Sequence, residues 1–270
     1  MRPDRLLPYF AFAYAWTWAI QSLFIATGQP MTAPLGLLLL TLAAVGPSLA
    51  AVVVGAATTE ASAGQSLPSR LRASLRACWG APGWLGGPWW LVALFMAQAT
   101  ILVAAGLGLL TGTSAPSARF VPIMVATAVL TGFGEELGWR GFAYSRLVAR
   151  WERRAPVLGV IWANLSLGVA WALWHLPTAY FPSADGLTLG FLHYVALVIA
   201  FSTLTGWVFE RAGRRTMIAV LAHAGISLCV VVLPAEPGPQ ALRLIVTVAL
   251  AALAGADLVR MRRRRQSLAS

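Results

Sequence analysis

Long apolar runs recur along this 270-residue chain, and they constrain its fold more than any other feature. Several of them approach or exceed the about 20 residues that a helix needs to cross a bilayer. The chain is 59% hydrophobic and 11% charged, whereas a soluble domain is about half apolar and about a quarter charged. A soluble fold of this composition would expose large apolar patches and precipitate. We therefore predict an all-α fold, a polytopic transmembrane helix bundle.

Segments rich in glycine and proline separate the apolar runs and divide the chain into predicted spans. No internal repeat is evident, so the whole chain, residues 1–270, is interpreted as a single membrane domain. The first run is long for a signal peptide and has no clear small-x-small cleavage site, which favours a retained first span. The eight predicted spans are residues 6–27, 35–57, 89–111, 120–138, 156–176, 189–209, 216–234 and 240–259.

The arginines, which account for all twenty basic residues, predict the orientation of these spans. With the N-terminus in the cytoplasm, nearly all of them fall in inner connections, and only Arg119 and Arg243 fall in outer ones. This asymmetry fits the positive-inside rule and predicts two cytoplasmic termini. The net charge of +11 then needs no nucleic-acid partner. We expect the basic tail, residues 260–270, to contact anionic lipid headgroups. Residues 68–79 are either an amphipathic helix on the inner interface or a solvated loop.

Two adjacent carboxylates, Glu135 and Glu136, end the apolar run of the fourth span. On a helix, Glu136 and Arg140 are four residues apart on one face and can form an ion pair. Glu135 points about 100° away and has no partner at that spacing. Charged groups in spans are costly and usually functional. We therefore predict that Glu135 is a general base acting on water. The alternative is a helix-end ion pair with Glu135 turned to the aqueous interface.

Two of the three histidines also lie in apolar spans. His175 follows Trp171 by four residues in the fifth span, and His223 precedes Ser227 by four in the seventh, so each pair shares a helix face. Either histidine alone could be a buried core residue. Together with Glu135 they bring an acid, two imidazoles and a hydroxyl into one small bundle, which favours a catalytic site.

The depth of these residues poses a geometric problem. Counted from the inner arginines at about 1.5 Å per residue, His223 lies roughly 12 Å deep and His175 roughly 28 Å deep. Straight, upright helices would not bring the two rings together. We therefore expect that helices tilt or break near the site, or that the fifth span starts outside the bilayer core. Residues 137–150 either continue the fourth span or lie along the interface.

The three motifs and their order resemble those of the CAAX-protease and bacteriocin-processing (CPBP) family, which includes the Ras-converting CAAX endopeptidases. EELGWR at residues 135–140 resembles the family motif EExxxR. WALWH at residues 171–175 resembles FxxxH, with Trp171 where phenylalanine is usual. HAGIS at residues 223–227 resembles the third motif, with Ser227 in place of the usual asparagine. The resemblance covers roughly residues 121–227, and the first three spans carry no motif.

The resemblance implies an intramembrane endopeptidase that cleaves a membrane-associated or lipidated peptide or protein. Its partners would be membrane lipids and that substrate, and its expected location is a bacterial plasma membrane. The catalytic residues that the resemblance implies are Glu135 and His175, which activate the attacking water, and His223 and Ser227, which stabilise the oxyanion. The supporting residues that the resemblance implies are Glu136, Arg140 and Trp171.

The cofactor stays open between none and zinc. Glu135, His175 and His223 could form a three-ligand zinc site with an open position. The same residues also support a glutamate-based mechanism without metal. The chain lacks HExxH, whose two histidines would make zinc the natural choice.

Two other classes of function remain. One is a non-catalytic scaffold or bacteriocin-immunity protein that retains the fold, and the exchange at Ser227 is its motivation. The other is a transporter that uses Glu135 and the histidines as a proton relay. The transporter is disfavoured because the chain has no evident repeat and no obvious pair of broken helices.

Overall fold

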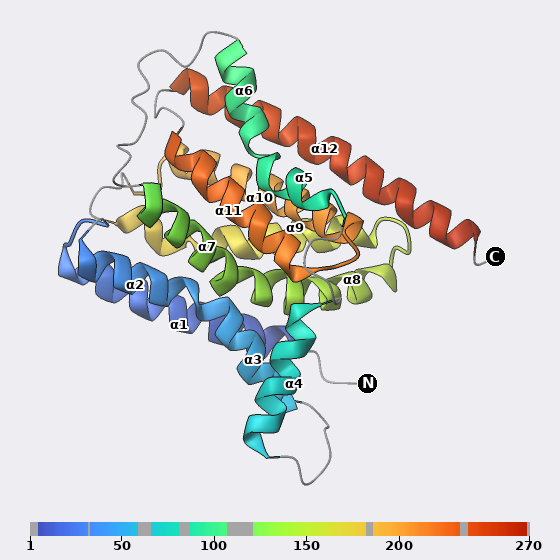
Figure 1. Cartoon of the computed structure of the whole chain (residues 1–270), viewed down its shortest axis with the longest axis horizontal. Coiled ribbons are helices and arrows are strands. Elements are labelled where there is room, and N and C mark those ends of the chain that lie inside the picture. Colours follow the sequence, from blue (N-terminus) through green and yellow to red (C-terminus); the bar gives the residue numbers. More distant parts are fainter. Residues whose placement is uncertain are drawn as a thin grey trace.

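The computed structural model describes residues 5–31, 33–58, 66–80, 87–106, 121–181, 186–232 and 237–268, and its elements are all helices (Figure 1). This confirms the predicted all-α class. A π-helical turn at Trp139–Tyr144 and a 3-10 helix at Leu176–Tyr180 accompany the α-helices. The α-helices are α1 (Leu6–Thr27), α2 (Pro34–Ala44), α3 (Gly46–Thr58), α4 (Leu67–Trp79), α5 (Trp89–Phe95), α6 (Gln98–Gly106), α7 (Val121–Gly138), α8 (Ser145–Glu152), α9 (Gly159–Trp174), α10 (Leu189–Arg211), α11 (Thr216–Val232) and α12 (Pro237–Ser267).

Five helical stretches in the described parts of the chain are long and apolar enough to cross a bilayer, and the protein is an integral membrane protein. They match five of the predicted spans. Three predicted spans are not among the five. The first is helix α1, the third is split into α5 and α6, and the seventh has an apolar helix too short to count. The total of eight and the cytoplasmic termini stay predictions. The five stretches are Pro34–Ala57, Val121–Glu152, Gly159–Tyr180, Leu189–Arg211 and Ala241–Ser267.

Parts of the predicted layout lie outside the described residues. These parts are residues 1–4 of the predicted domain, the ends of three predicted spans at residues 107–111, 120 and 233–234, Arg119 in the outer connection, and residues 269–270 of the basic tail.

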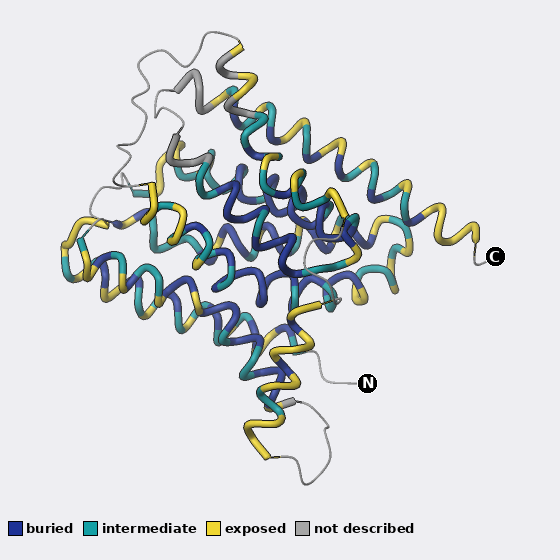
Figure 2. The backbone as a smooth tube through the Cα atoms, viewed as in Figure 1, coloured by how far each residue is buried: buried dark blue, intermediate teal, exposed yellow. Residues whose placement is uncertain are grey.

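Helix α7 lies inside the bundle, with α3 and α2 on one side and α11 on the other (Figure 1). Beyond α11, α9 packs on α10 and α10 packs on α12. Buried positions gather along α7, α10 and α11, whereas α4 and the end of α12 carry exposed ones (Figure 2). Every residue from Gly134 to Arg140 is buried. The end of α7 that carries the two glutamates is therefore enclosed by protein on all sides.

Two glycines let α7 approach its neighbours closely. A Cβ atom on Gly134 would lie 2.7 Å from the carbonyl oxygen of Ala44, which is closer than side chains come. A Cβ atom on Gly138 would overlap the carbonyl oxygen of Pro47 at the start of α3. Backbone contact of this kind allows tight helix packing in membranes. It fixes the distance between α7 and the α2–α3 pair at the level of the glutamates.

Replacing Gly138 with alanine is expected to destabilise the bundle by about 1–3 kcal/mol, because the added methyl group overpacks a rigid backbone contact. The thermal unfolding midpoint of the detergent-solubilised protein measures the effect. Gly106→Ala is the matched control, since a Cβ atom there meets nothing within 4 Å. Equal midpoints for the two variants would contradict the close packing at Gly138.

The fourth predicted span does not end at residue 138. It continues through the π-helical turn into α8, so residues 137–150 extend the span instead of lying along the interface. A π-helical turn holds one residue more than an α-helical turn and is frequent at functional sites. Five of its six residues are buried, among them Trp139 and Arg140. The turn thus directs most of its side chains into the core.

Charged residues join the ends of α8, α10 and α12. Arg262 pairs with Glu152 at 2.7 Å and with Glu210 at 3.1 Å, and Arg214 pairs with Glu210 at 2.7 Å. The arginine-rich ends of three predicted spans therefore meet at one end of the bundle, as the orientation prediction requires. That this end is cytoplasmic stays a prediction.

Residues 68–79, for which the sequence allows either an interfacial helix or a solvated loop, belong to α4. Its Ser74 and Cys78 are buried, and the Ser74 hydroxyl donates to the Ala51 carbonyl oxygen at 3.2 Å. Burial raises the pKa of the Cys78 thiol to about 11. The thiol therefore stays protonated at neutral pH, and its role is packing instead of thiolate chemistry.

Candidate active site

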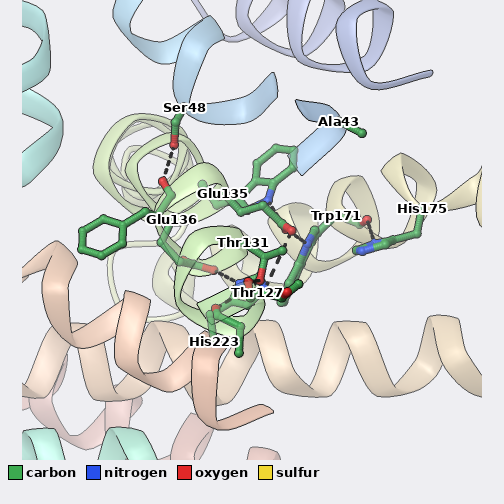
Figure 3. Close-up of polar contacts among 12 residues, drawn as sticks. Ala43, Ser48, Thr127, Thr131, Glu135, Glu136, Trp171, His175 and His223 are labelled. Carbon is green, nitrogen blue, oxygen red and sulfur yellow. Dashed lines mark hydrogen bonds and ion pairs between the residues drawn. The ribbon is translucent and has the colours of Figure 1, made fainter. Parts of the chain in front are cut away.

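Glu135 is held inside the bundle by two indole groups (Figure 3). Its Oε2 atom accepts hydrogen bonds from Trp171 Nε1 at 2.7 Å and from Trp139 Nε1 at 3.2 Å. The side chain is buried, with a residue exposure of 4%, so it does not turn to an aqueous interface. The expectation that Glu135 has no partner four residues away is wrong, because Trp139 occupies that position. The partner of Glu135 at this spacing is the neutral indole N–H group of Trp139, and not a positively charged side chain.

Trp171 has a larger part than the sequence suggested. We inferred an aromatic supporting residue, and the phenylalanine usual at this position has no hydrogen-bond donor. Its indole N–H donates the shorter of the two hydrogen bonds that orient the Glu135 carboxylate. Its ring also stacks near the Arg140 guanidinium, whose carbon lies 5.0 Å from the ring centroid.

Glu136 is the centre of a buried charge cluster. Its Oε1 atom accepts from Arg140 Nη1 at 2.9 Å, so the predicted ion pair is present. The same atom lies 2.8 Å from His223 Nδ1 on α11. Arg140 Nη2 donates to the carbonyl and hydroxyl oxygens of Ser202 on α10, each at 3.2 Å. Glu136 and Arg140 are fully buried, so this cluster joins α7, α10 and α11 through the core.

His223 connects the two glutamates. Since its Nδ1 atom faces Glu136, its Nε2 atom is directed elsewhere, and it lies 3.8 Å from Glu135 Oε1. An imidazole between two carboxylates can carry a proton on both ring nitrogens. The pairing of His223 with Glu136 was not predicted, because the two residues are 87 positions apart in sequence and lie on different helices.

His175 lies where α9 breaks into the 3-10 helix, as the depth argument required. Its Nδ1 atom is 2.8 Å from the Trp171 carbonyl oxygen. A carbonyl only accepts hydrogen bonds, so Nδ1 carries the proton and Nε2 keeps a lone pair in the neutral ring. The ring is packed edge-on against Trp174 and Tyr194. His175 is therefore a fixed acceptor.

One cavity of about 270 Å³ brings the predicted catalytic residues together. Glu135, His175, His223 and Ser227 all line it. Trp171 also faces it, whereas Glu136 and Arg140 lie behind the wall. The remaining lining residues are apolar at Leu197, Val198, Phe201 and Ile226 and polar at Thr131, Tyr194 and Arg243.

Arg243 is the charged lining residue that the sequence did not lead us to place at the site. We assigned it to an outer connection, but it lies in the second turn of α12 with 6% exposure, in the cavity wall. The sequence could have indicated its place in the cavity wall, since position 243 falls inside the predicted span 240–259. A charged group within an apolar span is a functional signal in its own right.

Two of the three residues named for zinc have a donor atom engaged by another side chain. Among the described residues, no group of three His, Cys, Asp or Glu side chains is placed to hold a metal ion. His223 Nδ1 is engaged by Glu136, and Glu135 Oε2 is engaged by two indole groups. The three residues named for zinc line one cavity, where His223 Nε2 lies 3.8 Å from Glu135 Oε1.

Two comparisons with known proteins cover the segment that carries the motifs. Residues 117–229 match the family model described as "Type II CAAX prenyl endopeptidase Rce1-like". A curated protein of Methanococcus maripaludis, "CAAX prenyl protease 2", is 24% identical over 119 residues. This match covers 42% of the present chain and 41% of the relative, so the similarity spans less than half of either protein. Both findings support the resemblance drawn from the three motifs.

Proposed function

Because its motif-bearing segment belongs to the CPBP family of CAAX proteases, we propose that this chain is an intramembrane endopeptidase. It hydrolyses a peptide bond of a membrane-associated or lipidated peptide. The observation that carries the proposal is the shared cavity of Glu135, His175 and His223. Its acid, acceptor and donor groups are those that hydrolysis by water needs.

The first step is the attack of water on the peptide carbonyl. The lone pair of His175 Nε2 accepts one hydrogen bond from the water and orients it. Glu135 takes the proton as the water oxygen bonds to the carbonyl carbon. Two indole N–H groups fix the Glu135 carboxylate, so little reorganisation is needed.

The second step is the collapse of the tetrahedral intermediate. His223 carries a proton on Nε2 and donates it in a hydrogen bond to the oxyanion, with the Ser227 hydroxyl as a second donor. Glu135 then returns its proton to the leaving amine nitrogen as the C–N bond breaks. Glu136 and Arg140 hold His223 in place from behind the cavity wall. The products are a carboxylic acid and an amine, which ionise to a carboxylate and an ammonium group, and the Glu135 carboxylate is regenerated.

The reaction as proposed uses no metal ion, because the chain's own residues supply the base and the oxyanion donors. The alternative of a non-catalytic scaffold or immunity protein rests on Ser227 alone. Serine keeps a donor at this position, which favours the enzyme. Placement in a bacterial plasma membrane with cytoplasmic termini remains part of the proposal, since the curated relative is archaeal.

A cleavage assay tests the function and the metal question together. Purified protein in lipid nanodiscs is expected to cleave a fluorescent peptide that carries an S-farnesyl cysteine. Preincubation with 1,10-phenanthroline is expected to leave the rate unchanged within about twofold, because no metal takes part. Loss of the rate with chelator, and its return with zinc, would refute the metal-free mechanism. No cleavage, together with biological activity that survives Glu135→Gln and His175→Ala, would favour the scaffold.

A further inference from the structure

A second hollow, a groove of about 460 Å³, lies between α9, α10 and α12. Ala196 and Ala200 on one face of α10 line this groove, whereas Leu197 and Phe201 on another face line the catalytic cavity. Helix α10 is therefore the wall between the two spaces. Thr203 is the one polar residue in the groove lining, and its hydroxyl already donates to the backbone of its own helix. The groove surface is thus suited to a hydrocarbon chain.

The groove opens on the side of the bundle and runs along α12. Its lining residues Ala252 and Ala256 are exposed, and so is the neighbouring Leu253, so this side faces the bilayer hydrocarbon. The lining extends on α12 from Val248 to Val259, which is about 16 Å of helix. Half of a hydrocarbon core of about 30 Å, the share of one leaflet, is about 15 Å. The groove therefore matches the depth over which one acyl chain extends.

Exposed arginines on α12 stand where the groove ends. Arg260 and Arg263 follow the lining residues Ala256 and Val259 by four positions, so they continue the same side of the helix. The acid on this part of α12, Asp257, is bound by an arginine and an indole of α10. Two cations are therefore presented at the end of an apolar groove.

The end of α8 adds two more cations at the same place. Arg262 of α12 pairs with Glu152 at 2.7 Å, which ties the end of α8 to the arginine-rich part of α12. Arg153 and Arg154 follow Glu152 directly in the chain, and both are exposed. The groove and its cations together have the two parts of a phospholipid, a hydrocarbon surface and a charge opposite to that of a phosphate.

We propose that the groove between α9, α10 and α12 and the arginines at its end form a binding site for one anionic phospholipid. An acyl chain lies in the groove, and Arg260 and Arg263 bind the phosphate, with Arg153 on the other side of the headgroup. A guanidinium binds a phosphate with two parallel hydrogen bonds, which fixes its position. Basic pockets between membrane helices bind anionic headgroups in this way. The inference does not depend on the proposed endopeptidase function.

The prenyl chain of a lipidated substrate fits this groove less well. Its peptide would have to reach Glu135, and α10 stands between the groove and the catalytic cavity. A prenyl chain also gives the four exposed arginines no partner. A phospholipid accounts for both the apolar groove and the charge.

Native mass spectrometry of the full chain in detergent tests the site with two probes. These are phosphatidylglycerol and phosphatidylcholine with the same acyl chains. One phosphatidylglycerol per chain is expected to be retained, with an affinity about 10- to 100-fold higher than that of phosphatidylcholine, because each arginine at the membrane surface adds to the attraction. Equal affinities for the two lipids would overturn the proposal.

The charge is tested by the double variant Arg260→Gln with Arg263→Gln. Its affinity for phosphatidylglycerol is expected to fall about tenfold or more, to the level of phosphatidylcholine. The matched control is Arg72→Gln with Arg76→Gln, which removes two exposed arginines at the same spacing from α4. An equal fall in the two double variants would show attraction to net charge alone and would overturn the site.

The groove is tested by Ala252→Trp, which places an indole in the groove from an exposed position. The affinity for phosphatidylglycerol is expected to fall about tenfold, while Ala249→Trp, exposed on the same helix outside the groove, keeps the wild-type value. Unchanged thermal unfolding midpoints without added lipid establish that both variants fold. If Ala252→Trp binds as the wild type does, or if the farnesylated reporter peptide displaces the phospholipid, the assignment of the groove is wrong.

Discussion

Replacing Glu135 with glutamine is expected to lower kcat for peptide cleavage by about 1000-fold while leaving the folded state intact. Glutamine has nearly the same shape, and its amide oxygen still accepts from Trp171 and Trp139. It cannot take a proton from water, so the attacking nucleophile is lost. The measurement is the initial cleavage rate of the farnesylated peptide reporter by equal amounts of folded protein. Thermal unfolding midpoints within about 2 °C of the wild type would establish that folding is retained.

The matched control for this variant is Glu152→Gln. Glu152 is a glutamate on the same continuous span, but it pairs with Arg262 and does not line the cavity. Its exchange is expected to change the cleavage rate less than twofold. Normal turnover by Glu135→Gln would exclude Glu135 as the base, and His175 would then be the remaining acceptor on the cavity wall.

Removing Arg140 is expected to produce the largest loss of stability. In Arg140→Met the fully buried Glu136 loses its arginine partner and is left with His223 alone, and Ser202 loses two hydrogen bonds. Breaking a buried pair on one side costs about 3–5 kcal/mol. The free energy of unfolding, measured by denaturant titration in mixed micelles, reports this cost.

A double variant tests the cause of that loss. Adding Glu136→Gln to Arg140→Met removes the buried carboxyl group that lost its arginine partner, so part of the stability is expected to return. Arg214→Met is the control, since Arg214 is part-exposed and its partner Glu210 keeps Arg262. Because Arg214 is part-exposed and Glu210 keeps a second arginine, the loss of this pair is expected to cost about 1 kcal/mol or less. A double variant that is less stable than Arg140→Met would contradict the explanation by charge.

Local sequence patterns were enough to predict the fold class and the residues that line the site. Apolar runs predicted helices because a bilayer leaves a spanning chain few alternatives. The i, i+4 rule predicted the pair of Glu136 and Arg140, since both lie on one helix. It also placed Trp171 beside His175. These inferences depend only on positions a few residues apart.

What the patterns could not supply is the set of contacts between helices. The bonds from His223 to Glu136 and from Trp171 to Glu135 depend on how each helix is rotated about its axis. That rotation follows from packing at sites such as Gly134 and Gly138, which look like ordinary glycines in the sequence. The prediction for Arg243 was wrong for a related reason. The orientation argument assigned this arginine to a loop, whereas it lies on the face of α12 that is turned toward the cavity.

The π-helical turn makes the site sensitive to register. It holds one residue more than an α-helical turn, so it sets the phase between the glutamates before it and α8 after it. A relative without that additional residue would have its carboxylates turned by about 100° relative to the following segment. Such a protein would retain the residues of the EExxxR motif, but Glu135 would no longer point into the cavity. In this fold, conservation of spacing across Trp139–Tyr144 is therefore as informative about activity as conservation of the acidic residues.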